Sequence, residues 1–158
     1  ATAMVNKYCD GTLPAATATT DADEALKALL QAKAAEADAA MLALDFSTGI
    51  LAVKDFIDAV NLYVTEQAPW VLAKDDANTA RLHTVLNTIC ESLRAIAVLY
   101  HPVMPQTMRD LWSQLGADAA LGPIGEQRIQ DAARWGQLPA GSTVTKGEAL
   151  FPRLEEPA

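Results

Sequence analysis

The sequence predicts an all-α fold, a single bundle of about five helices with an irregular C-terminal tail. Hydrophobic residues make up 51% and charged residues 20% of the 158 residues, which suits one domain of ordinary size with a real core. Alanine, the strongest helix former, is abundant. Apolar residues recur every three or four positions over long stretches, as they do along the buried side of a helix. We therefore treat residues 1–158 as one domain.

The chain opens inside a helix rather than at the start of one. Residues 1–9 have helical spacing of apolar side chains, and Asp10-Gly11 forms a C-terminal stop, but no capping residue precedes them. We expect this helix to lack its first turns, as it would in a piece of a longer protein. Residues 11–20 contain glycine, proline and four threonines, which predicts an exposed linker.

A long helix is expected from about Asp21 to Leu44. Asp21 is placed to cap it, and Glu24, three residues later, completes an approximate capping box. Apolar side chains follow one face of this helix: Leu26, Leu30, Ala37, Met41 and Leu44. Residues 45–49 interrupt the pattern and predict a break.

The clearest helical period lies between Ile50 and Gln67. Its buried stripe consists of Ile50, Val53, Ile57, Val60 and Val64, widened by Phe56 and Tyr63. The opposite, polar stripe consists of Lys54, Asp58, Asn61 and Thr65. This helix must end or bend at Pro69, because proline disfavours helical geometry at the preceding residue, Ala68.

Two further apolar stripes follow. The first predicts a helix from about Asn78 to Tyr100, with Leu82, Leu86, Ile89, Leu93, Ile96 and Tyr100 on its core face. Pro105 is well placed at the first turn of the next helix, which Gly116 ends. Its apolar stripe consists of Met108, Leu111, Trp112 and Leu115. A short helix is expected over about 126–135, and the tail from Gly136 is expected to be irregular or briefly extended.

Charge and missing motifs exclude several functions. The formal net charge of −8 argues against non-specific binding of nucleic acid, since phosphate contacts need Lys and Arg. Any contact with RNA must then depend on a local surface or on a larger parent protein. No phosphate loop, nucleophile elbow or paired-His signature is present, so we predict no catalytic residue and no metal site. The carboxylates occupy positions where a solvated helix surface explains them.

No membrane segment or secretory signal is expected either, because no run approaches about 18 consecutive apolar residues. Cys9 and Cys90 are the only cysteines, and with His83 and His101 as the other soft ligands they do not form a zinc site. We interpret the two thiols as small buried hydrophobes in a reducing compartment, with a disulfide as the alternative.

Trp70 is the candidate binding residue. Pro69 before it removes a backbone donor and fixes the turn, which holds the indole in a defined direction. A tryptophan presented in this way can stack on an unpaired base, a contact worth roughly 1–3 kcal/mol. Alternatively, Trp70 fills a gap between helices, as we expect of Trp112. Composition and spacing alone favour the gap-filling role.

Several segments resemble the anticodon-binding domain of methionyl-tRNA synthetases. Residues 61–74, which contain the Pro-Trp pair, carry the most specific likeness. Residues 5–7 with 10–11 resemble the end of that domain's first helix, residues 100–105 its broken late helix and residues 150–154 its closing segment. These segments occur in the expected order and span almost the whole chain. The Pro-x-x-Pro element within 100–105 is shared more widely among class I synthetases.

The resemblance implies a helical bundle that follows a Rossmann-type catalytic domain, which joins methionine to its tRNA using ATP with Mg²⁺. It implies methionine tRNA as the partner, with the bases of its CAU anticodon read one by one, and a cytoplasmic protein, by default a monomer. No cofactor is expected in this chain itself. Trp70 occupies the position of the tryptophan that stacks under the first anticodon base, so the resemblance reverses the preference and favours a base platform. Asn61 on the polar stripe is the second candidate, either for contact with RNA or for a structural role at the helix surface.

One departure from the family matters. Its first helix carries an Asn and an Arg, four residues apart, that contact anticodon bases, and in our alignment this chain begins just after that Arg. The chain would then keep the stacking platform without the whole hydrogen-bonding set, so we expect low affinity. Leu150 and Phe151 either cover a surface towards the catalytic domain or pack within this bundle.

Three other interpretations make different predictions. The equivalent domain of another class I synthetase would share the fold, but residues 61–74 favour the methionine enzyme. An acidic helical module that binds proteins would show no dependence on anticodon sequence. A purely structural domain would bury Trp70.

Overall fold

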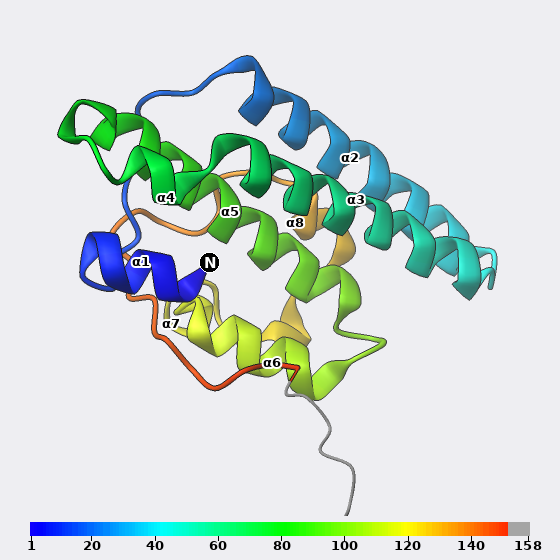
Figure 1. The fold of residues 1–158 in the computed structure, drawn as a ribbon. Coiled ribbons are helices and arrows are strands. Elements are labelled where there is room, and N and C mark those ends of the chain that lie inside the picture. Colours follow the sequence, from blue (N-terminus) through cyan, green and yellow to red (C-terminus); the bar gives the residue numbers. More distant parts are fainter. Residues whose placement is uncertain (152–158) are drawn as a thin grey trace, which may run out of the picture.

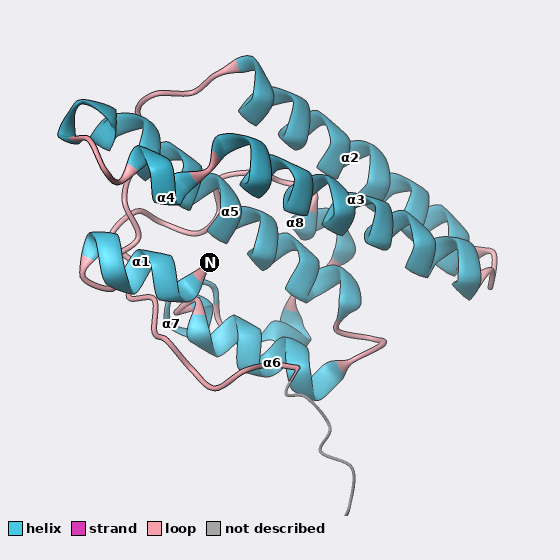
Figure 2. Ribbon diagram, viewed as in Figure 1, coloured by secondary structure: helices cyan, strands magenta, loops and turns pink. Residues whose placement is uncertain are grey.

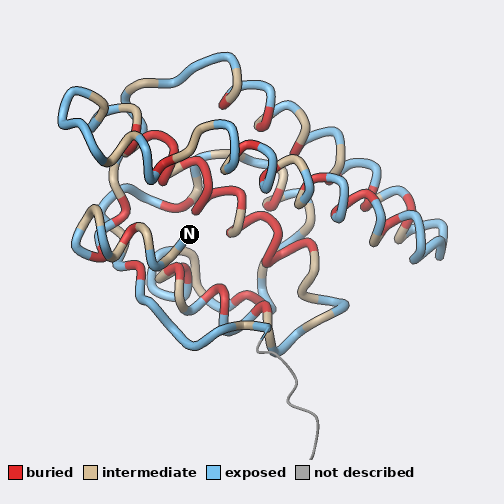
Figure 3. The backbone as a smooth tube through the Cα atoms, viewed as in Figure 1, coloured by how far each residue is buried: buried red, intermediate tan, exposed pale blue. Residues whose placement is uncertain are grey.

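Helix α5 (Thr79–Tyr100) runs through the middle of the structure, and the other helices pack around it (Figure 1). The computed structural model describes residues 1–151 of the chain. Fifteen of the 22 residues of α5 are buried, so it contacts neighbours on nearly every side (Figure 3). By length and composition alone Asp76–Tyr100 could cross a membrane, but 83% of its most apolar window is buried inside the bundle. It is the core helix that the apolar stripe predicted.

Helices α2 (Asp21–Leu42) and α3 (Phe46–Gln67) form an antiparallel hairpin beside α5. The cap of α2 differs from the prediction: Thr20 is the N-cap, and its capping box is completed by Asp23, not by Asp21 and Glu24. The reason is that Asp23 at the third helical position accepts the backbone N–H of Thr20 at 2.8 Å.

The turn between these helices is shorter than predicted. Residues 46–49 are helical, because the Asp45 side chain caps α3 by accepting the backbone N–H of Thr48 at 3.1 Å. The chain reverses over residues 43–45, where Leu44 has a left-handed φ of 60°. The expected break at 45–49, and the expected helical place of Leu44, were therefore wrong.

The predicted apolar stripe of α3 is displaced by a fraction of a turn. Val53, Phe56, Val60 and Tyr63 are buried, whereas Ile50, Ile57 and Val64 are only half-buried. Phe56 and Tyr63, which were expected to widen the buried stripe, thus lie at the centre of the buried face of α3 rather than at its edge. The polar stripe is confirmed: all four of its members, Lys54, Asp58, Asn61 and Thr65, are exposed.

Helix α3 ends where Pro69 predicted. Ala68 adopts a left-handed conformation with φ 43° and ψ 62°, and Pro69 then begins the one-turn helix α4 (Pro69–Leu72). The short helix η1 (Asp76–Asn78) leads into α5. Neither α4 nor η1 was expected, because a single turn leaves too short an apolar pattern to detect.

Short elements complete the bundle (Figure 2). They are α1 (Thr2–Cys9), α6 (Pro105–Gln114), α7 (Ala117–Leu121), η2 (Ile124–Glu126) and α8 (Ile129–Ala132). The predicted helix over 126–135 is replaced by η2 and α8, and α7 was not predicted. From residue 136 to 151 the chain is irregular, as expected; residues 152–158 of the tail lie outside the described residues.

The segment between α1 and α2 is fastened to the bundle, contrary to its prediction as an exposed linker. Leu13 is buried, and a single β-bridge joins Thr12 to Thr143. The Thr84 hydroxyl accepts the backbone N–H groups of Thr17 and Ala18 at 3.0 and 2.9 Å. Threonines 12, 17, 19 and 20 are exposed, so the composition identified a surface segment but not its attachment.

A buried ion pair on α5 anchors the C-terminal segment. Glu91 and Arg94 are 2% and 1% exposed, and their side chains are 2.7 Å apart. The Glu91 carboxylate accepts the backbone N–H groups of residues 136–138, and Arg94 donates to the carbonyls of Ala132 and Arg134. The expectation that every carboxylate lies on a solvated surface was therefore wrong here. Backbone groups at the irregular tail need partners, and this pair supplies them.

The two cysteines are unpaired. Cys90 is fully buried and Cys9 is half-buried, and both are free thiols. This agrees with small hydrophobic packing residues for Cys90 and, in part, for Cys9, and not with a disulfide between them.

Candidate nucleic-acid interface

Trp70 projects from the one-turn helix α4, which follows the end of α3. Pro69 is buried and Leu72 packs against the core, while the Trp70 side of α4 faces solvent. The backbone N–H of Val71 donates to the carbonyl of Ala68 at 2.7 Å, which closes the turn at its start. Trp70 is 45% exposed, and within residues 1–151 its indole N–H has no acceptor. The structure thus presents half of an aromatic ring on a fixed support.

Trp112 provides the contrast that the sequence predicted. It is 0% exposed, and its indole N–H donates to the carbonyl of Gly122 at 2.9 Å. Trp112 fills the space between helices and Trp70 does not, so the prediction of a purely structural domain, in which Trp70 is buried, is wrong.

Asn61 lies on the exposed face of α3, the helix that precedes the Trp70 turn. It lies six positions before Gln67, the last residue of α3, or about 9 Å along the helix axis at 1.5 Å per residue. Its backbone carbonyl accepts the Thr65 hydroxyl at 3.0 Å, but within the described chain its side-chain amide makes no hydrogen bond. The last turns of α3 and the single turn of α4 therefore carry one predicted residue each, Asn61 and Trp70, and both have an available surface.

Behind this surface lies a buried polar cluster that the sequence did not reveal. Asp23 is 0% exposed and accepts hydrogen bonds from the Tyr63 hydroxyl, from Thr88 and from the backbone of Thr20. Arg81 forms an ion pair with it at 2.5 Å. The cluster ties α2, α3 and α5 together at the end of the bundle that carries α4.

The cluster keeps Asp23 ionised. Burial opposes the charged carboxylate, but hydrogen bonds from Tyr63, Arg81 and Thr20 outweigh it and lower the pKa of Asp23 to about 2. Burial, and then the hydrogen bond to Asp23, raise the pKa of Tyr63, so its hydroxyl remains a donor. The Thr20-x-x-Asp23 spacing is a capping signal that could have located Asp23. No local pattern pairs it with Arg81, which lies 58 residues away.

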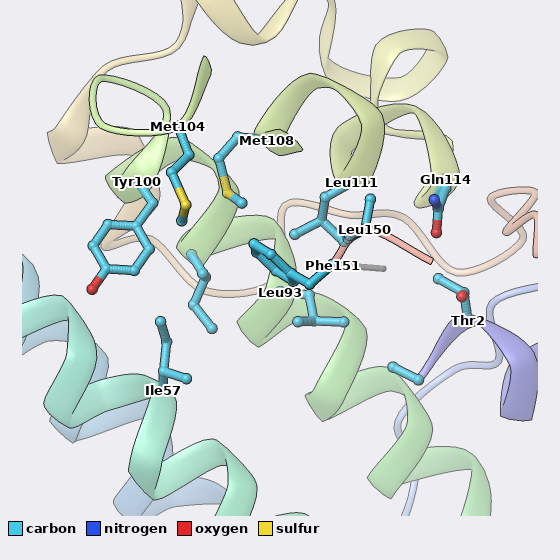
Figure 4. Close-up of a pocket in the computed structure, with 12 residues that line it drawn as sticks. Thr2, Ile57, Leu93, Tyr100, Met104, Met108, Leu111, Gln114, Leu150 and Phe151 are labelled. Carbon is cyan, nitrogen blue, oxygen red and sulfur yellow. The ribbon is translucent and has the colours of Figure 1, made fainter. Parts of the chain in front are cut away.

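A second feature, an apolar cavity of about 400 Å³, lies on α5 next to the start of α1 (Figure 4). Its lining includes Leu93, Met108 and Leu111 from α5 and α6. Leu150 packs against the core here, whereas Phe151 is 68% exposed at the cavity. Of the two roles considered for this pair, packing within the bundle describes Leu150, and Phe151 leaves most of its surface uncovered.

The described residues contain no group of three or more His, Cys, Asp and Glu side chains that could hold a metal ion. Neither the cavity nor the Asp23 cluster brings a nucleophile and a base to a common open site.

Known proteins share this chain's sequence and fold. Residues 13–158 match the family described as the anticodon binding domain of methionyl tRNA ligase. A methionine–tRNA ligase of Streptomyces coelicolor is 57% identical over 157 residues, which cover 98% of this chain and 29% of that relative. One from Caldanaerobacter subterraneus is 36% identical over 152 residues, which cover 96% of this chain and 23% of that relative.

A solved structure agrees. The crystal structure of the apo form of Mycobacterium tuberculosis methionyl-tRNA synthetase matches with a TM-score of 0.86 at 28% identity, over 99% of this chain and 30% of that chain. The chain thus spans less than a third of the length of these relatives. Since the family match covers nearly all of its residues, the chain belongs to the family of methionyl-tRNA ligase anticodon-binding domains.

Proposed function

We propose that this chain recognises the CAU anticodon of methionine tRNA as part of a methionine–tRNA ligase, with Trp70 stacking on the first anticodon base. The observation that carries the proposal is the half-exposed indole of Trp70 on a turn fixed by Ala68 and Pro69. A rigid aromatic support favours stacking, because little side-chain freedom is lost when the base binds.

Asn61 is the second proposed contact. An exposed amide both donates and accepts hydrogen bonds, so it can pair with a base edge or with the RNA backbone. Its place on the outward stripe of α3, before the turn that carries Trp70, supports this role.

The charge of the chain bears on how it would bind. With a net charge of −8, phosphate contacts contribute little, and selectivity must come from stacking and base contacts. We expect weak binding by the 158 residues alone, with an affinity that depends only shallowly on salt.

The remaining activity is assigned to the part of the relatives that this chain does not match. We place ATP, Mg²⁺ and methionine there, following the resemblance to methionyl-tRNA synthetases. A catalytic domain is the proposed partner at the apolar cavity, since the cavity has an apolar lining and Phe151 beside it is 68% exposed. A cytoplasmic monomer fits this role in protein synthesis.

An NMR titration of the three indole N–H signals tests the proposal. The ligands are an RNA hairpin with the CAU anticodon and a matched hairpin with its first anticodon base changed. We expect the Trp70 signal to shift more with CAU, while buried Trp112 stays unchanged. Trp135, which has Lys27 near its ring at 5.9 Å, serves as a second internal control.

Two results would contradict the proposal. Equal shifts of Trp70 with both hairpins would show RNA binding without anticodon recognition. No shift with either hairpin, at the highest soluble RNA concentration, would favour the alternative of an acidic module that binds proteins.

A further inference from the structure

The direction of the Trp70 indole depends on how the end of α3 is held. Trp70 itself has no side-chain hydrogen bond among the described residues, and its neighbour Ala68 has an unfavourable left-handed backbone. The nearest side-chain hydrogen bond is one residue before that turn, where the side-chain amide oxygen of Gln67, Oε1, accepts from Arg81 at 2.6 Å. Figure 1 shows the end of α3, α4 and the start of α5 grouped at this side of the bundle.

Arg81 holds several segments at once. One terminal nitrogen donates to the Asp23 carboxylate and, at 3.0 Å, to the carbonyl of Ala18. The other donates to Gln67 and, at 3.3 Å, to the Tyr63 hydroxyl. A planar guanidinium can satisfy such a set of acceptors because its donors have a fixed geometry, whereas an ammonium group cannot.

The arrangement also argues against Arg81 as a direct RNA contact. Its side chain is only 16% exposed, and both terminal nitrogens already donate to protein oxygens. The positive charge is balanced by the buried Asp23 carboxylate, so little of it is available to phosphate. What Arg81 can do is fix the end of α3 against α2 and α5.

We infer that Arg81 is a positioning residue for the anticodon site: through Gln67 it sets the orientation of α4 and hence of the Trp70 indole. This inference rests on the proposed function, and it adds a residue that acts without touching RNA. A binding group must be held within a fraction of an ångström of its working geometry by its supporting residues. Loss of the Arg81 guanidinium leaves α4 packed through Pro69 and Leu72, but Gln67, at the end of α3 just before it, loses its hydrogen bond to α5.

The test compares Arg81→Lys and Gln67→Leu with Arg94→Lys in the 158-residue chain. Arg94 is the matched control because it belongs to the other buried ion pair of α5, which anchors residues 132–138 instead of α4. The Trp70 indole N–H shift and its relaxation are measured without RNA. Affinities for the CAU hairpin and for the altered hairpin are then measured at a temperature where each variant is folded.

Arg81→Lys should move the Trp70 signal, increase its mobility and reduce CAU affinity about tenfold, part of what stacking of one base contributes. Gln67→Leu should act in the same direction with a smaller effect, and it carries the test if Arg81→Lys does not fold. Arg94→Lys should lower stability while leaving the Trp70 signal and the preference for CAU unchanged.

The inference is overturned if Arg81→Lys or Gln67→Leu is folded and leaves both the Trp70 signal and the CAU preference unaltered. It is also overturned if Arg94→Lys disturbs Trp70 equally. Failure of the proposed function has a different signature: Trp70→Ala would then leave the CAU preference intact. In Arg81→Lys and Gln67→Leu, which keep Trp70, the indole signal measured without RNA would still show whether Arg81 positions the ring.

Discussion

Trp70 and Trp112 both follow a proline that begins a helix, yet the two regions use their tryptophan differently. Pro69 and Pro105 each occupy a first-turn position. Trp112 stands in the third turn of α6, with its whole surface buried and its N–H bonded to Gly122. Trp70 comes directly after its proline, in a helix of a single turn. Trp112 is surrounded by neighbouring residues, whereas Trp70 is partly exposed to solvent.

The difference shows whether each indole ring contributes mainly to the free energy of folding or to that of binding. A buried tryptophan must find a partner for its N–H, and Trp112 does so within the fold. The exposed half of Trp70 contributes little to folding and remains available to a ligand. Stability and binding measurements should therefore respond to these two residues in opposite ways.

Trp112→Ala is expected to have the largest effect on folding. Removing a fully buried large aromatic side chain leaves a cavity and should cost about 3–5 kcal/mol in the free energy of unfolding. Urea denaturation of the variant and of the unaltered chain measures this. A cost close to that of Trp70→Ala would remove the distinction between the two regions.

Substituting phenylalanine at each position keeps an aromatic ring but removes the indole N–H, so it tests the contribution of that hydrogen-bond donor. Trp112→Phe leaves the Gly122 carbonyl without its donor and should cost about 1–3 kcal/mol. Trp70→Phe removes no hydrogen bond among the described residues and should change stability by less than about 0.5 kcal/mol. Thermal melts of the matched pair decide this; similar losses would mean that the Trp70 N–H has a structural partner.

Acid should weaken the Trp70 end of the bundle through Asp23. Its pKa is lowered from 3.8 to about 2, so the stabilisation is fully present above pH 4 and is lost as the pH falls towards 2. The expected loss is on the order of 1–2 kcal/mol. Unfolding free energies of the unaltered chain and of Asp23→Asn, measured from pH 5 to 2, should converge as the pH falls. A constant difference between them would contradict the assignment.

Trp70→Ala should affect folding much less than Trp112→Ala, by about 1–2 kcal/mol, since the ring is only half-buried. The same change should abolish the preference for the CAU hairpin. Denaturation and hairpin binding measured on one preparation provide both values. Strong destabilisation with unchanged anticodon preference would reverse the roles assigned to the two tryptophans.

Much of the site was predictable because its signals are local. Pro69 acts on the geometry of Ala68 directly, so the end of α3 and the place of Trp70 follow from adjacent residues. The polar stripe that carries Asn61 follows from helical periodicity. By contrast, the start of α3 was misplaced by four residues, because its cap, Asp45, lies in a stretch without apolar periodicity.

The sequence by itself thus determined the helical class, the long helices and the position of the turn that carries Trp70, all of which depend on neighbours a few positions away. Only the tertiary structure decided that Asp23 and Glu91 are buried with arginine partners, and that Arg81 joins α2, α3 and α5 behind Trp70. The physical reason is that a charged residue is expected on the surface unless a segment far away in the sequence is known to pair with it: Arg81 in the case of Asp23, and the backbone of residues 136–138 in the case of Glu91. That pairing is a consequence of how the helices pack.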